Sequence, residues 1–132
     1  MNAPTPELSP KHTVSLVEDR CEVHFSISGF WSLDIFKSFL DDVNAAALPL
    51  MKARKPIYAL GDFGGFVPQN QETGEAIRDH LLAAQKYGLK RLAVVAGSAL
   101  VKLQYRRLSR GVEVEFFDTE GDAIEWLRKD RP

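Results

Sequence analysis

The sequence predicts an α/β domain built on one mixed, mainly parallel sheet of five strands, with an N-terminal β-hairpin and four helices. Three observations support this prediction. Residues 13–28 alternate between apolar and polar side chains, as strands do. After them, short apolar segments alternate with longer segments of helical periodicity, which is typical of parallel strands joined by right-handed crossovers. The length of 132 residues, 45% of them hydrophobic, fits one domain with its own core.

The N-terminal part has the pattern of an arm followed by a hairpin. Residues 1–11 contain three prolines and no apolar run, so we expect a flexible arm there and a single domain over residues 12–130. Segments 13–18 and 21–28 predict the two strands of the hairpin. In the second strand an apolar set alternates with polar residues, so the hairpin is expected to bury one face. That set is Cys21, Val23, Phe25 and Ile27.

A helix and a central strand are expected next. Ser32 is a suitable N-cap, apolar residues recur at helical spacing as far as Ala47, and Pro49 is expected to end the helix. Segment 57–60 is a short apolar run without alternation, which favours a strand covered on both faces. The glycine-rich segment 61–68 is expected to form a loop.

The rest of the chain continues the alternation of helices and strands. We expect a helix over about 71–87, a strand over 92–96, a helix from 97 to about 110, a strand over 112–116 and a helix after 118. Gly88 and Gly111 are helix stop signals. The resulting order is ββαβαβαβα.

Composition and charge exclude several classes of protein. The 17 Lys and Arg residues are balanced by 18 Asp and Glu residues, so the basic excess of a dedicated nucleic-acid binder is absent from the sequence. A single cysteine, Cys21, cannot form an intrachain disulfide, and we expect a reduced core thiol. No apolar run is long enough for a transmembrane segment, and the first residues do not resemble a secretory signal. We therefore expect a cytoplasmic protein.

The segment 61–68 is the first candidate site. It follows a parallel strand and precedes a helix, which is where sites form in open α/β sheets. Its spacing is neither that of a P-loop nor that of a dinucleotide fingerprint, so no cofactor is predicted. Either the segment is a tight structural loop, or its aromatics contact a protein partner or a small apolar ligand. The residues concerned are Asp62, Phe63, Gly64, Gly65 and Phe66.

The second candidate is a basic ridge on the third predicted helix. Lys102, Arg106 and Arg110 lie four residues apart and therefore share one helix face. Such a ridge could bind an acidic partner, a phosphate or an anionic lipid head group. The alternative is internal pairing with the acidic residues that follow from Glu113 to Glu125.

The histidines do not form a recognisable site. His12 lies where the predicted arm meets the domain, His24 on the polar face of a strand and His80 within a helix, where a solvated surface position is expected. No spacing fits a metal site, and no nucleophile motif is present. The sequence therefore predicts no catalytic residues and no metal.

The chain resembles a known family. The hairpin, the Gly29-Phe30-Trp31 entry to the first helix, the strand ending in Asp62 and the closing segment 116–127 are similar to the SpoIIAA-like branch of the STAS superfamily (sulfate transporter and anti-sigma factor antagonist). The resemblance covers about residues 12–128. It implies the STAS fold and a non-enzymatic switch that binds protein partners, with a related lipid-binding fold as the alternative lineage.

The resemblance also suggests where to look for a phosphorylation site. Antagonists of this branch carry a phosphorylatable Ser or Thr in an Asp-Ser-Ser/Thr-Gly-like motif near the second helix. The matching region here lacks the Asp-Ser pair, but Thr73-Gly74 is similar to the end of the motif and lies several residues later. Thr73 is therefore the candidate phosphosite.

Three functions remain open from the sequence. The first is a non-catalytic cytoplasmic regulatory module that binds a protein partner. The second is a carrier or sensor of a small apolar or lipid-like ligand, suggested by the aromatic residues of the first helix and of the segment 61–68. The third is an enzyme. A homodimer through an exposed edge strand is also compatible with the pattern.

Overall fold

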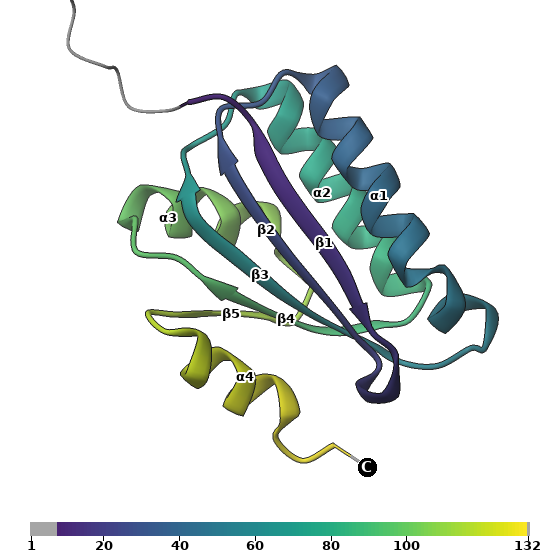
Figure 1. Ribbon diagram of the computed structural model, residues 1–132. Helices are drawn as coiled ribbons and strands as arrows, with labels where there is room; N and C mark the ends of the chain where they lie inside the picture. The colour runs from purple at the N-terminus through teal and green to yellow at the C-terminus, as the bar shows by residue number, and fades with distance from the viewer. Residues whose placement is uncertain (1–7, 132) are drawn as a thin grey trace, which may run out of the picture.

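Five strands form one sheet in the order β1-β2-β3-β4-β5 (Figure 1). The computed structural model describes residues 8–131. β1 pairs with β2 in antiparallel orientation, and the remaining pairs are parallel, as predicted from the hairpin and the alternating pattern. The strands are β1 (Lys11–Val17), β2 (Glu22–Gly29), β3 (Ile57–Phe66), β4 (Leu89–Val95) and β5 (Val114–Phe117).

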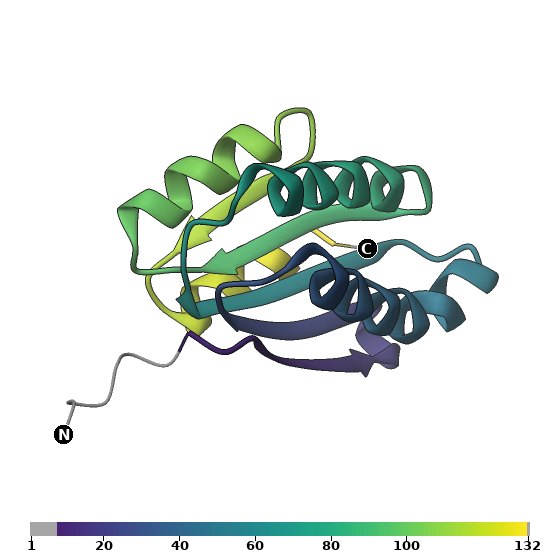
Figure 2. The same cartoon turned by 90° about the horizontal axis from the view of Figure 1, so that it is seen from above.

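The helices cover the two faces of the sheet unequally. They are α1 (Leu33–Lys52), α2 (Gln71–Lys86), α3 (Ala99–Leu108) and α4 (Glu120–Arg128), and a short 3-10 turn, η1 (Glu18–Arg20), closes the hairpin. The main core includes side chains from α1, α2 and α3, whereas α4 packs a smaller cluster on the opposite face. Figure 2 shows α1 above the β1–β2 side of the sheet and α2 beside β4.

The segment 61–66 is the second half of β3, so the prediction of a loop over 61–68 was wrong. β2 also pairs with this half, with a register shift between Ser26 and Ser28: Ser26 lies opposite Asp62, and Gly29 lies opposite Phe66. Gly61 is needed inside the strand because a Cβ atom there would lie 2.6 Å from the Phe25 ring. Gly61 thus leaves room for the Phe25 ring.

The first helix continues through Pro49, contrary to the prediction that this residue ends it. A proline removes one backbone donor and crowds the preceding turn, but it does not forbid a further turn that packing stabilises. Leu50, which follows directly, is fully buried in the main core, and the helix ends at Lys52. Burial of Leu50 therefore outweighs the local preference.

Part of the predicted arm is attached to the sheet. Residues 1–7 lie outside the described residues, but Lys11 already belongs to β1, and the Leu8 carbonyl accepts a hydrogen bond of 2.9 Å from Phe30 N. At this crossing Gly29 has φ +89°, and a Cβ atom on it would lie 2.5 Å from the Ser9 carbonyl oxygen. Both features favour glycine at the end of β2.

Candidate functional site

An apolar cavity of about 570 Å³ lies between the sheet and the helices α1 and α2. Its floor is formed by β2, β3 and β4, through residues such as Val23, Ala59 and Leu92. Its walls are formed by α1 and α2, through residues such as Val43 and Leu81. A volume of this size falls within the range of about 300–1,000 Å³ that is usual for small-molecule sites.

Small side chains explain why the space is not filled. Four alanines line it, one from α1, one from β3 and two near the end of α2: Ala47, Ala59, Ala83 and Ala84. Protein interiors otherwise pack densely, with few voids larger than a water molecule. A space of this size among apolar side chains is therefore a feature to explain rather than ordinary packing.

Aromatic rings form the inner end of the cavity. The Phe25 and Phe39 ring centroids lie 5.7 Å apart, and the Phe63 and Tyr105 centroids lie 5.0 Å apart with nearly perpendicular planes. These rings come from β2, α1, β3 and α3, so four elements fix the shape of this end. Burial raises the pKa of Tyr105, which keeps its hydroxyl protonated.

A polar contact connects the two helices across the cavity. His80 Nε2 of α2 lies 3.0 Å from Asn44 Oδ1 of α1, and both residues line the cavity. Burial lowers the pKa of His80, which favours the neutral imidazole. The sequence placed His80 on a solvated surface, and the structure leaves it half-buried, because the helix turns this residue toward its neighbour α1.

The cavity opens toward the C-terminal ends of α1 and α2. Leu48 and Tyr87 line it and are nevertheless 43% and 67% exposed. Lys52, in the last turn of α1, also lines it and is exposed. These residues form the exposed rim of the cavity.

The predicted site on residues 62–66 is divided between the interior and the surface. Phe63 and Phe66 are only 2% and 4% exposed, so these aromatics do not form an exposed contact patch. Phe63 instead lines the cavity. Asp62 is exposed and accepts a hydrogen bond of 2.9 Å from Gly64 N, and Gly65 packs against Ser28 of β2.

Thr73, the candidate phosphosite, lies in the first turn of α2 and is fully buried. Its hydroxyl donates to the Trp31 carbonyl oxygen at 3.2 Å, and its backbone N–H donates to the Asn70 side chain. In this conformation Thr73 connects α2 to the entry of α1 and is inaccessible to a kinase.

The basic ridge of α3 is partly paired within the molecule. Lys102 Nζ lies 3.4 Å from Asp118 Oδ1, and the Arg106 guanidinium lies 4.9 Å from the centroid of the Phe116 ring. Arg110 follows the end of α3, and its carbonyl accepts a hydrogen bond from Arg78. The three residues therefore do not form one uniform unpaired surface.

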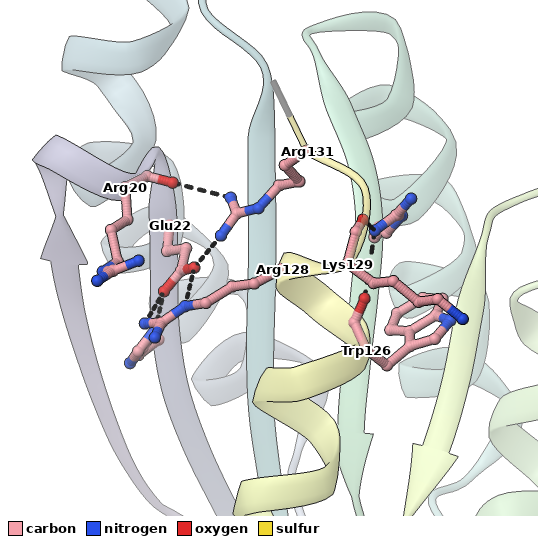
Figure 3. Close-up of polar contacts among 8 residues, drawn as sticks. Arg20, Glu22, Trp126, Arg128, Lys129 and Arg131 are labelled. Carbon is pink, nitrogen blue, oxygen red and sulfur yellow. Dashed lines mark hydrogen bonds and ion pairs between the residues drawn. The ribbon is translucent and has the colours of Figure 1, made fainter.

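A buried ionic cluster lies at the start of β2, where α4 ends (Figure 3). Glu22 at the start of β2 is fully buried and accepts two hydrogen bonds from Arg128, at 2.9 and 3.0 Å. Arg131 also donates to Glu22 and to the Arg20 carbonyl. His24 Nε2 lies 2.8 Å from the same carboxylate.

The cluster is structural in character. Burial alone would raise the pKa of the Glu22 carboxyl, but hydrogen bonds, chiefly from Arg128, lower it from 4.5 to about 2. The carboxylate is thus ionised and saturated with donors from the C-terminal segment. The sequence did not predict this ionic cluster, because Glu22 was assigned to the polar face of β2 and no local pattern connects it with Arg128 or Arg131.

Metal binding and membrane insertion receive no support from the described residues. Within residues 8–131 no group of three or more His, Cys, Asp or Glu side chains could hold a metal ion. In the same part of the chain no helix is long and apolar enough to span a bilayer.

Comparisons with known proteins connect this fold to a family. A family model described as SpoIIAA-like matches residues 23–128. A solved structure, described as an uncharacterized protein from the DUF3478 family with a SpoIIAA-like fold, from Shewanella loihica PV-4, superposes with a TM-score of 0.64. It is 19% identical, and the match covers 96% of this chain and 99% of that one, which shows likeness of fold. A search of curated proteins found no match.

Proposed function

The chain belongs to the SpoIIAA-like family, and on that premise we propose that it is a non-catalytic regulatory module that binds a small apolar or lipid-like molecule between α1, α2 and the sheet. The observation that carries the proposal is the apolar cavity itself. Its size fits a small molecule, and its inner walls are aliphatic and aromatic. Each buried methylene group of a ligand would contribute about 0.8 kcal/mol.

The position of the cavity suggests how binding would be read out. α1 and α2 contact each other partly through His80 and Asn44, which cross the opening between the helices. A ligand in the cavity would favour the helix spacing that accommodates it. A protein partner that contacts α1 and α2 from outside would then sense whether the cavity is filled.

A non-catalytic role is supported by the chemistry of the lining. Among residues 8–131, the ionisable side chains on the cavity wall are Lys52, His80, Tyr87 and Tyr105, without a carboxylate. A general acid–base pair or an activated nucleophile requires a second group within hydrogen-bond reach. The contact that His80 makes is with the amide of Asn44.

The test is to fill the cavity from one of its walls. In Ala47→Phe, a ring enters the cavity from α1, whereas the control Ala45→Phe places the same ring on the exposed face of the same helix. We expect the neutral fluorophore phenylnaphthylamine to bind the wild-type protein and the Ala45→Phe variant, and to lose affinity for the Ala47→Phe variant. Melting temperatures establish that both variants fold.

The proposal fails if phenylnaphthylamine binds all three proteins equally. It also fails if the wild-type protein binds neither this probe nor other apolar molecules. In that case the space between α1 and α2 closes in solution.

A second candidate function is the binding of a protein partner through α3. Leu100 and Leu103 on α3 are 66% and 57% exposed, beside the basic residues of the ridge. Exposed apolar side chains rimmed by charges are typical of interaction sites. A partner retained by the wild-type protein should be lost with Leu100→Ser/Leu103→Ser and kept with the exposed-face control Ala45→Ser. Equal retention would exclude this surface.

A further inference from the structure

The head group of the ligand can be inferred from the charges around the cavity opening. Among the described residues, Lys52 is the one permanently charged side chain on the cavity lining, and no Asp or Glu lies there. His80 and Asn44 add polar atoms near the same opening. Nothing on this lining would repel an anion, whereas a cationic group would meet Lys52.

A second hollow, of about 820 Å³, adjoins the opening and shares Met51 and Tyr87 with the cavity. We name it the basic hollow, because it is lined by Arg54, Lys55, Lys86, Lys90 and Arg91, with Glu113 as its single acid. Glu113 lies 3.9 Å from Arg91. Within residues 8–131, the other four cations of the basic hollow have no ion-pair partner.

The positive charge of the basic hollow is not explained by its position at two helix ends. α1 and α2 both terminate here, and a lysine in the last turn of a helix is commonly favoured by the helix dipole. That effect accounts for Lys52 and Lys86. It does not account for Lys55 and Lys90, which lie outside the helices and line the same hollow.

We propose that the ligand is a single-chain amphiphile with an anionic head group. Its chain would occupy the cavity, and its head group would lie at the opening between Lys52 and the basic hollow. This inference rests on the proposed function and adds the class of ligand. Charge complementarity favours such a ligand, because an apolar space and an unpaired cationic surface meet at Met51 and Tyr87 in a chain whose formal net charge is -1.

The test compares three amphiphiles of equal chain length: decanoate, decanol and decyltrimethylammonium. Each amphiphile is added below its critical micelle concentration, and its affinity is measured from the displacement of bound phenylnaphthylamine. We expect decanoate to bind about tenfold more tightly than decyltrimethylammonium, because one head group is attracted and the other repelled. Added salt should weaken the binding of decanoate and leave that of decanol nearly unchanged.

Lysine-to-alanine variants test where the head group of the ligand lies. Lys52→Ala and Lys86→Ala should each weaken decanoate binding by up to about fivefold, the range expected of an exposed ion pair. Neither should change the affinity for decanol. Lys37→Ala, on the exposed face of α1 and outside both hollows, is the matched control.

The outcomes separate the two proposals. If all three amphiphiles bind equally and the lysine variants have no effect, the inference about the head group is wrong, but the proposed function stands. If inorganic phosphate binds the basic hollow while no amphiphile displaces the probe, the hollow serves a free anion and the inference is also wrong. If the wild-type protein binds no apolar probe, both proposals fail.

Discussion

Replacement of Glu22 by glutamine removes the charge at the centre of the ionic cluster while keeping the size of the side chain. The carboxylate accepts hydrogen bonds from Arg128 and Arg131 and contacts His24. Glutamine offers one acceptor in place of the delocalised anion, so two guanidinium groups lose their counter-ion. The cluster joins β2 to the C-terminal end of α4, which are distant in sequence.

The expected loss of stability follows from the pKa of Glu22. A tenfold change in proton affinity corresponds to about 1.36 kcal/mol. Lowering of the pKa from 4.5 to about 2 therefore corresponds to about 3 kcal/mol at neutral pH. The loss expected when one partner of a buried ion pair is removed is about 3–5 kcal/mol, which is consistent.

The assay is urea denaturation, followed by tryptophan fluorescence at several pH values. Because the folded-state pKa is lowered, the stabilisation is complete above pH 4.5 and is lost as pH falls toward about 2. The difference between the wild-type protein and Glu22→Gln should therefore be constant near neutral pH and shrink below pH 4.5. Glu18→Gln, an exposed carboxylate in η1, is the control and should be neutral.

A stability of Glu22→Gln equal to that of the wild-type protein would refute this reasoning. A large difference that does not change between neutral and acidic pH would refute the electrostatic part alone, since it would indicate a packing effect.

Three further substitutions test other contacts by urea denaturation. Thr73→Val removes the hydroxyl that donates to the Trp31 carbonyl and should cost about 1 kcal/mol, whereas no loss would show that this bond is unimportant. Gly61→Ala should cost about 1–3 kcal/mol because its Cβ atom would overlap the Phe25 ring; unchanged stability would mean that the ring moves freely. Lys102→Ala should change stability by less than about 1 kcal/mol, since its pair with Asp118 is exposed, and a larger loss would assign the ridge a structural role.

Element order and topology were predictable because each depends on local patterns. Alternation identified β1 and β2, and helical spacing identified α2 within one residue of its ends. Parallel pairing followed from the alternation of strands and helices, and the structure confirms it. The resemblance to SpoIIAA-like proteins is confirmed by the match over residues 23–128.

The errors arose where tertiary contacts override local signals. Glycines at 61, 64 and 65 are typical of a loop, yet β2 and the aromatic packing around Gly61 hold that segment in a strand. Pro49 is a typical helix end, yet burial of Leu50 extends α1 beyond it. In both cases the stabilising partner lies on another element, which a local pattern does not contain.

The candidate site was only partly visible in the sequence. Aromatic residues of α1 and Phe63 were singled out, and they do lie near or on the cavity. The cavity itself depends on small residues such as Ala47 and Ala84, which line it from two different helices. Alanines are good helix formers everywhere, so their sequence positions carried no signal of an unfilled space.

An isotope-filtered nuclear Overhauser experiment on the protein with bound decanol tests directly whether the ligand lies between α1, α2 and the sheet. Protons of the alkyl chain should show contacts with the side chains of Val43, Ile77 and Leu81, which line the cavity between α1 and α2. Contacts confined to Leu100 and Leu103 on the outer face of α3, or no contacts at saturating decanol, would contradict the account.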